Sequence, residues 1–412
     1  MSTNQNYNPD ELESLEWLNP KFFTEVLIQY ENAPDLKLND LKLSPASAQG
    51  DHYASVMFRA SVEYSTVKGN ISKSLIVKTM SDQGGQKKRM VNDSHIFQTE
   101  IAMYTELLPK FEGILRDAGV ECKLFVPCIY HSLRPRQVLI FEDLVAQGYQ
   151  VIRNRSATLD ELRSALEKLA KWHAVSHKLL KEQPELFEEL QYNISTLPNF
   201  LNQSFITNAL PNFIYMLAEL EGLKKYKHYF EAMRGNLIQQ WADTLGEYRK
   251  SPQENSYYVL CHGDFHIRNL MFKNSSCMLL DFQLSHVGPL VNDFLYAMYM
   301  LFSAEDRGKR RDELINYYLE VFANTLKKIG YRGKAPSFEE FQRQMIDKRH
   351  NEFMLLTTFL PMQISARKNA IDPFRRRTSM YKDKDYQEEV AYLLERMNNL
   401  GYFVDIQNSI KS

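Results

Sequence analysis

Two short stretches decide the fold predicted for this chain: HGDFHIRN at residues 262–269 and LLDF at residues 279–282. Asp264 provides a carboxylate that can accept the proton of an attacking hydroxyl group. Asn269 and Asp281 provide oxygen atoms, the ligands that Mg²⁺ prefers, and the Asp-x4-Asn loop places base and metal ligand on one wall. The apolar residues before Asp281 predict a buried strand that ends there. This combination predicts phosphoryl transfer from a nucleotide that is bound together with Mg²⁺.

The chain has 412 residues, of which 44% are hydrophobic and 25% are charged, and this length suffices for two lobes with separate cores. Lys and Arg total 50 and Asp and Glu total 51, so the charge gives no reason to expect a nucleic-acid partner. The polar start lacks the apolar core of a secretory signal, and the longest apolar run, residues 294–302, is far shorter than the roughly 20 residues that cross a bilayer. The four cysteines form no CxxC pair, which is typical of reduced thiols. We therefore expect a cytoplasmic protein without a membrane segment.

The first part of the chain is predicted to form a small lobe. Residues 1–35 are expected to be an N-terminal extension with an amphipathic helix at residues 20–31, where apolar side chains recur at helical spacing. Residues 36–142 then contain strand-like segments and one helix. The expected elements are strands at residues 56–64, 73–79 and 138–141 and a helix at residues 94–108. They predict a β-rich N-lobe that binds the nucleotide.

The second part of the chain, residues 143–412, is predicted to be mostly helical. Thr158 and Glu161 have the spacing of a capping box, which predicts the start of a long helix. Short strands around Asp264 and Asp281 interrupt the helical pattern. This part is expected to be a large C-lobe that carries the catalytic loop, the metal site and the acceptor pocket. The predicted fold class is therefore α+β.

A lysine that contacts the α- and β-phosphates needs a carboxylate to hold it, and this carboxylate usually comes from the next helix. Lys78 ends the predicted strand at residues 73–79, and Glu100 lies in the helix that follows it. Lys73 and Glu106 are alternatives with less suitable positions. The sequence therefore predicts Lys78 and Glu100 as part of the nucleotide site.

The segments that cover the phosphates and contact the base have weaker signals. No GxGxxG motif is present, and Gly50 with Ser55 is the candidate turn over the phosphates, although an ordinary turn explains these residues equally well. Glu142 and Leu144 lie where the N-lobe ends. We expect this hinge to present backbone N–H and C=O groups to adenine.

His262 and Asp293 are predicted to support the catalytic loop. Asp293 follows the metal-binding strand and opens an apolar helix, so it is either the helix N-cap or a hydrogen-bond partner of the loop near His262. We favour the second role. His262 and His266 flank Asp264, but no further ligand has zinc spacing, so we expect packing rather than metal binding. The basic run at residues 375–379 is similar to a phosphorylation site, and a solvated loop is the simpler interpretation.

The order of these motifs, completed by GPLVND at residues 288–293, resembles the insect ecdysteroid-kinase-like family. That family belongs to the aminoglycoside/choline-kinase branch of the protein-kinase-like fold, and the resemblance covers roughly residues 36–400. It implies a bilobal fold and ATP-dependent phosphorylation of ecdysteroid hydroxyls, with detoxification as a further role. HGD in place of HRD distinguishes the chain from protein kinases. The resemblance implies these roles: Asp264 as base, Asn269 and Asp281 as Mg²⁺ ligands, and Lys78 with Glu100 as the phosphate clamp.

Residues 192–216, here called the charge-free segment, contain no Asp, Glu, Lys or Arg but several Asn and aromatic residues. An uncharged wall with amides suits a neutral, bulky, hydroxylated small molecule, whereas choline or an aminoglycoside would need carboxylates or an aromatic cage. Packing between helices explains the segment equally well. We expect a steroid acceptor and no obligate protein partner. The alternatives are a kinase of xenobiotic or choline-like alcohols and a non-catalytic pseudokinase.

Overall fold

A five-stranded antiparallel sheet forms the N-terminal part of the chain, with strand order β1-β2-β3-β5-β4. The computed structural model describes residues 11–12, 15–46, 55–80, 95–153, 155–253, 256–368, 378–404 and 406. The strands are β1 (Lys37–Pro45), β2 (Val56–Thr66), β3 (Gly69–Thr79), β4 (Cys128–Ser132) and β5 (Val138–Glu142). Side chains alternate between the two faces of a strand, and on β2 every second residue from Val56 to Tyr64 is buried.

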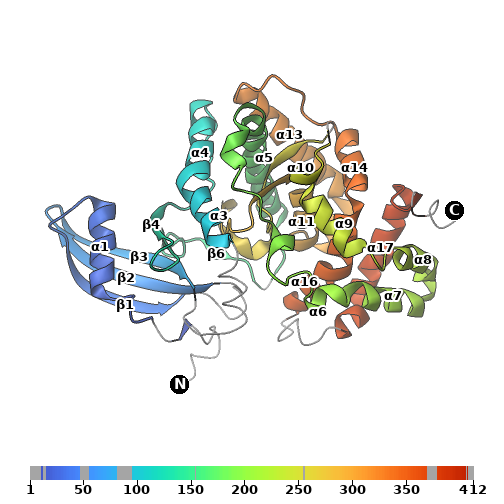
Figure 1. Cartoon of the computed structure of the whole chain (residues 1–412), viewed down its shortest axis with the longest axis horizontal. Coiled ribbons are helices and arrows are strands. Elements are labelled where there is room, and N and C mark those ends of the chain that lie inside the picture. Colours follow the sequence, from blue (N-terminus) through green and yellow to red (C-terminus); the bar gives the residue numbers. More distant parts are fainter. Residues whose placement is uncertain are drawn as a thin grey trace.

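Helix α1 (Pro20–Glu31) covers the face of the sheet that those residues share (Figure 1). Asn19 caps the helix by accepting a hydrogen bond from the backbone N–H of Phe22, and Pro20 follows directly. Phe23, Val26 and Leu27 pack with the sheet into a common core. The helix predicted at residues 20–31 is confirmed with the same bounds.

The predicted helix at residues 94–108 is confirmed in position but differs in length. It consists of α3 (Ile96–Ala102), a π-helical turn (Met103–Leu107) and α4 (Leu108–Asp117), while Ser94 lies outside the described residues. Pro109 cannot donate a backbone hydrogen bond, and the wide turn lies directly before it. The helix therefore continues past the proline at which a sequence pattern suggests an end.

The rest of the chain is mostly helical and lies on the other side of α3 and α4 from the sheet (Figure 1). Its central helix is α5 (Leu159–Glu182), which begins with the predicted capping box between Thr158 and Glu161. The other helices are α6 (Ser204–Thr207), α7 (Ala209–Glu219), α8 (Lys227–Ala232), α9 (Leu237–Leu245), α10 (Glu247–Lys250), α11 (Val291–Met300), α12 (Ala304–Lys309), α13 (Arg311–Lys328), α14 (Phe338–Asp347), α15 (Arg349–Met354), α16 (Leu360–Arg367) and α17 (Lys384–Asn399).

Short strands interrupt these helices. β7 (Tyr258–Cys261) pairs with β10 (His286–Pro289), and β8 (Leu270–Lys273) lies between β6 (Gln150–Val151) and β9 (Ser276–Leu279). The HGDFHIRN stretch connects β7 to β8, and Asp281 follows β9. Both stretches that decide the predicted fold are therefore placed by short buried strands.

The chain has an α+β fold, as predicted, with an N-terminal sheet and a larger helical part. One hydrophobic core lies between the sheet and α1, and a second contains α3, α4 and the helices from α5 onward. The domain boundaries at residues 35/36 and 142/143 stay predictions.

Among the described residues, no helix combines the length and apolar character needed to cross a membrane. All four cysteines are free.

Candidate active site

Asp264 lies in the loop after β7, and three side chains surround its carboxylate. The hydroxyl of Tyr296 donates to Oδ1 at 2.7 Å, and Nδ2 of Asn269 donates to Oδ2 at 3.1 Å. Nε2 of His266 lies 3.4 Å from the same Oδ2. The Asp264 side chain keeps 18% of its surface exposed, so a substrate can still reach it.

These neighbours stabilise the ionised form of Asp264. Burial opposes ionisation, but the nearby His266 and hydrogen bonds from His266 and Tyr296 lower the pKa of Asp264 to about 2. Nδ1 of His266 accepts from the backbone N–H of Arg268, so the proton of the neutral ring lies on Nε2, facing Asp264. The candidate base is therefore deprotonated and oriented before any substrate binds.

Asn269 and Asp281 lie side by side, because the backbone N–H of Leu280 donates to the carbonyl oxygen of Asn269 at 3.0 Å. The side-chain amide nitrogen of Asn269 is bound to Asp264, so its carbonyl oxygen is the atom that can bind a cation. Asp281 has a φ of 62°, a left-handed conformation that Asp tolerates better than most residues. An amide oxygen and a carboxylate are ligands that Mg²⁺ prefers, so these residues fit the predicted metal.

Lys78 forms ion pairs with its predicted partner Glu100 and also with Asp281, the predicted metal ligand. Its Nζ lies 2.6 Å from Oε2 of Glu100 and 2.8 Å from Oδ1 of Asp281, and its side chain is only 4% exposed. Burial disfavours the charged lysine, but Asp281 and Glu100 together raise its pKa. Burial also raises the pKa of Glu100, which Lys78 opposes and Asp281 reinforces. The two carboxylates therefore keep this buried lysine charged.

The geometry favours Lys78 and Glu100 over the alternatives Lys73 and Glu106. Lys73 lies on the opposite face of β3 and binds Glu31 of α1 at 2.7 Å. Glu106 is exposed in the π-helical turn. Lys78 differs from Lys73 because it occupies the face of β3 that points away from α1, where Glu100 of α3 reaches it.

Asp293 binds the backbone of the catalytic loop. Its carboxylate accepts from the N–H of His262 at 2.5 Å and from the N–H of Gly263 at 3.0 Å. Nε2 of His173 lies 3.1 Å away. Asp293 is not the N-cap of α11, because Leu290 occupies that position. A buried carboxylate with these donors holds the loop at the end of β7.

His262 joins the two stretches of the site. Its ring nitrogen Nε2 lies 3.0 Å from the carbonyl oxygen of Leu280, the residue before Asp281. Burial lowers the pKa of His262, so the neutral ring donates this hydrogen bond. The described residues hold no group of three or more His, Cys, Asp or Glu side chains that could bind a metal together. His262 thus links the catalytic loop to the strand end that precedes Asp281.

At the hinge the structure brings forward a residue that the sequence analysis passed over. Asp143, between Glu142 and Leu144, accepts from Nε of Arg59 at 2.7 Å and from the hydroxyl of Ser74 at 2.8 Å. Its own N–H donates to the carbonyl oxygen of Ser74, so this group is occupied by the sheet. In the sequence, Asp143 differs from its neighbours only by its charge at a strand end. Its partners Arg59 and Ser74 lie on β2 and β3, far away in the chain, so no local pattern indicates them.

The side chains of the other predicted hinge and phosphate residues lie as follows. Glu142 accepts from Nε2 of Gln147 at 3.0 Å, and the side chain of Leu144 is buried. The carbonyl oxygen of Leu144 accepts from the backbone N–H groups of Gln147 and Tyr149, and the predicted contact of this hinge with adenine stays a prediction. Ser55 lies directly before β2, and Gly50 lies outside the described residues. Met57 is the register partner of Lys78, so its side chain lies on the same face of the sheet as Lys78.

A row of aromatic rings leads from Asp264 to the charge-free segment. We call it the aromatic row, and its members are Tyr296, Phe359, Trp241, Phe200 and Phe205. Successive ring centroids are 6.1, 6.0, 6.5 and 5.7 Å apart. Phe200 and Phe205 are partly exposed, whereas Phe359 and Trp241 are buried. The charge-free segment, which includes α6, thus shares one aromatic cluster with the residue that binds Asp264.

One protein family and several solved structures are similar to this chain. The ecdysteroid kinase-like family matches residues 49–331, more than half of the chain. No curated protein matches the sequence. A choline kinase from Cryptosporidium parvum Iowa II is 10% identical, with 92% of this chain and 97% of that chain covered and a TM-score of 0.48. Amicoumacin kinase, solved with AMP-PNP, Ca²⁺ and Ami, is 11% identical, with 84% and 88% covered and a TM-score of 0.41. On the family match, the chain belongs to the ecdysteroid kinase-like family.

Proposed function

We propose that this small-molecule kinase transfers the γ-phosphoryl group of ATP to a hydroxyl of a neutral, apolar acceptor, and that the acceptor is an ecdysteroid. The observation that carries the proposal is the convergence of four residues: Asn269 donates to Asp264, Lys78 pairs with Asp281, and the backbone hydrogen bond from Leu280 to Asn269 brings these two pairs together. In this reaction the acceptor oxygen bonds to the γ-phosphorus and the bond to the β–γ bridging oxygen breaks. ADP leaves, and the hydroxyl proton passes to Asp264.

Each residue of the site has a role in that reaction. Lys78, held by Glu100 at 2.6 Å, binds the α- and β-phosphates of the nucleotide. Asn269 and Asp281 hold Mg²⁺, which when bound neutralises charge on the phosphates. Asp293 and His262 keep the loop in register with the strand end that carries Asp281. The protein contributes mainly by positioning charges and the base, which is the way phosphoryl transfer is accelerated.

The aromatic row supports an apolar acceptor. Tyr296 donates to Asp264, and the rings beyond it extend into the charge-free segment. Neighbouring rings are tilted against one another, with Phe200 and Phe205 at 78°, so they form a packed wall rather than a cage of ring faces around a cation. A steroid skeleton can make hydrophobic contact with the partly exposed members of this row, Tyr296, Phe200 and Phe205, and Asn side chains of the segment can orient its hydroxyl groups.

One experiment tests the proposal directly. The purified protein is incubated with Mg·ATP and separate acceptors: ecdysone, choline, an aminoglycoside and a plant phenolic glycoside. Mass spectrometry then detects a phosphorylated product, with Asp264→Asn as the inactive control. We expect phosphorylated ecdysone and no product from choline or the aminoglycoside. Preference for choline would overturn the proposed acceptor, and turnover by the Asp264→Asn variant at the normal rate would overturn the proposed base.

A further inference from the structure

We infer that the acceptor hydroxyl binds Oδ1 of Asp264 beside Tyr296, and that Tyr296 both positions Asp264 and forms the nearest wall of the acceptor site. This inference rests on the proposed phosphoryl transfer, because it concerns how the acceptor reaches the base. The hydroxyl of Tyr296 donates to Oδ1 at 2.7 Å, and this side chain is partly exposed. Tyr296 therefore lies at the surface of the site and not within a closed core.

The donors around the carboxylate leave one direction of approach. A carboxylate offers about four lone-pair positions, two on each oxygen. Oδ2 faces Nδ2 of Asn269 at 3.1 Å and Nε2 of His266 at 3.4 Å, so its positions are taken. Oδ1 receives a hydrogen bond from Tyr296, and within the described part of the chain its second position is the one left for an acceptor. The incoming hydroxyl is thus directed to the oxygen that Tyr296 already binds.

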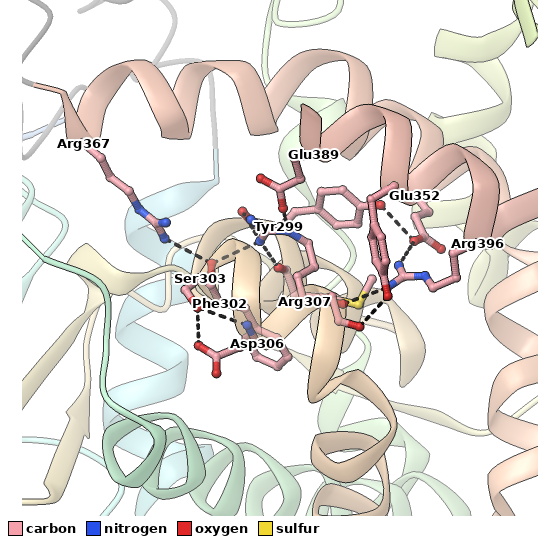
Figure 2. A network of polar contacts seen from close by, with 12 residues as sticks. Tyr299, Phe302, Ser303, Asp306, Arg307, Glu352, Arg367, Glu389 and Arg396 are labelled. Carbon is pink, nitrogen blue, oxygen red and sulfur yellow. Dashed lines mark hydrogen bonds and ion pairs between the residues drawn. The ribbon is translucent and has the colours of Figure 1, made fainter. Parts of the chain in front are cut away.

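Helix α11 holds Tyr296 in a defined place because both ends of the helix are fixed. At its start Asp293, three residues before Tyr296 and on the same side of the helix, binds the backbone of the catalytic loop. At its end the buried guanidinium of Arg307 donates to the carbonyl oxygens of Met298 and Phe302 (Figure 2). Met298 lies in the last turn of α11, where carbonyl oxygens lack the usual partner four residues further on, so a buried cation there stabilises the helix end.

The cation at the helix end is itself held by the C-terminal helix. Nε of Arg307 lies 2.5 Å from Oε1 of Glu389 on α17, and Arg396 of α17 donates to the carbonyl oxygen of Arg307 at 2.7 Å (Figure 2). Arg367 of α16 donates to the carbonyl of Phe302 at 3.2 Å. The same network contains Tyr299, whose hydroxyl donates to the buried Glu352 at 2.9 Å. Tyr296 and Tyr299 thus lie on the same helix, but the hydroxyl of Tyr296 binds Asp264 whereas that of Tyr299 binds Glu352.

The ring of Tyr296 gives it a second effect, on the choice of acceptor. A hydroxyl placed on Oδ1 brings its own carbon atom close to this ring, and Phe359 stands behind it with ring centroids 6.1 Å apart. Apolar carbon next to the reacting hydroxyl is therefore favoured over a charged group, which would lose hydration against the rings. Tyr296 acts on the base through its hydroxyl and on the acceptor through its ring.

Two substitutions separate these effects. Tyr296→Phe removes the hydroxyl and keeps the ring. We expect kcat with ecdysone to fall about tenfold, which corresponds to the loss of one hydrogen bond to a charged group. The KM values for ecdysone and ATP should stay unchanged. Tyr296→Leu also removes the ring, so we expect the KM for ecdysone to rise about tenfold in addition. Calorimetry with a non-hydrolysable ATP analogue present should show the same loss of ecdysone affinity, with nucleotide affinity unchanged.

Tyr299→Phe is the matched control, because it removes a tyrosine hydroxyl from the same helix but away from Asp264. We expect this variant to be less stable and to keep the wild-type kcat and KM. The inference is overturned if Tyr296→Phe keeps the wild-type kcat, or if Tyr296→Leu keeps the wild-type affinity for ecdysone. If the wild type binds Mg·ATP but ecdysone is not phosphorylated, the proposed acceptor fails. Slow ATP hydrolysis by water, which also uses Asp264, then still tests the effect of Tyr296→Phe on the base.

Discussion

Nζ of Lys78 lies 2.8 Å from Oδ1 of Asp281, although 203 residues separate the two in the chain. This ion pair joins the N-terminal sheet to the strand end that carries the proposed metal ligand. Glu100 binds the same nitrogen, so one buried cation is shared by two carboxylates. If Asp281 binds Mg²⁺ as proposed, Glu100 remains the carboxylate that holds Lys78.

Asp264→Asn tests the proton acceptor. The amide keeps the shape of the side chain but cannot take up a proton, so we expect turnover to fall by about 10²–10⁴-fold. Calorimetry should show nearly unchanged Mg·ATP affinity, because Asp264 is not one of the proposed metal ligands. Turnover close to that of the wild type would remove Asp264 from the mechanism.

Asp281→Asn tests the metal site. Asn tolerates the left-handed backbone at φ 62°, so the variant should fold normally, and Lys78 keeps its partner Glu100. Loss of the negative charge should weaken Mg·ATP binding by at least about 100-fold, because a metal contributes several kcal/mol at such a site. Titration calorimetry measures this change. Unchanged affinity in a folded variant would place the metal elsewhere.

Gly263→Ala tests the close approach behind the catalytic loop. Gly263 has a φ of 81°, and a Cβ atom there would lie 2.2 Å from the backbone oxygen of Leu284. The backbone at Leu284 can move away from such a Cβ atom only at a large cost in free energy. We therefore expect the free energy of unfolding to fall by several kcal/mol, as measured by denaturant titration.

Gly119→Ala is its matched control. Gly119 also has a positive φ, 69°, but no described atom lies within 4 Å of an added Cβ. Only the cost of the left-handed conformation remains, about 1–2 kcal/mol. Equal losses in the two variants would show that the contact with Leu284 is unimportant.

Phe205→Asp tests the apolar wall. A carboxylate in the charge-free segment would lose hydration against a steroid, so we expect the KM for ecdysone to rise about tenfold or more with ATP affinity unchanged. Tyr215→Asp places the same charge in the same segment at a side chain that is 62% exposed, and should leave the KM unchanged. Steady-state kinetics on both variants make the comparison. Identical behaviour of the two would mean that Phe205 serves only helix packing.

His350 makes stability depend on pH. Burial, with Arg349 nearby, lowers the pKa of His350 from its ordinary value of 6.5 to about 4. Between these pH values the unfolded chain binds the proton and the folded chain does not, so stability is lost as pH falls from 6.5 towards 4. Part of the ring is accessible, so we expect a loss on the order of 1–2 kcal/mol. Denaturant titrations of wild type and His350→Gln at pH 7 and about pH 4.5 should show a smaller loss in the variant, and equal losses would contradict this assignment.

The elements predicted most accurately are those whose signals are local. The helix at residues 20–31 has a capping Asn19 and a proline at its start, and both signals lie within four residues of the bonds they make. The capping box of Thr158 and Glu161 likewise acts over three residues. The continuation past Pro109 was missed, because packing of α4 in the core outweighs the local preference for ending a helix at proline.

The sequence by itself determined the motif order, the fold class and the candidate residues Asp264, Asn269 and Asp281. Their spacing within short loops already limits which of these side chains can line the same side of the site. Only the tertiary structure decided between Lys73 and Lys78, since both lie on β3 and differ in which face meets Glu100. It also revealed Asp143 at the hinge and Tyr296 beside the base. Hydrogen bonds between residues far apart in the chain depend on how strands and helices pack, and no local pattern records that packing.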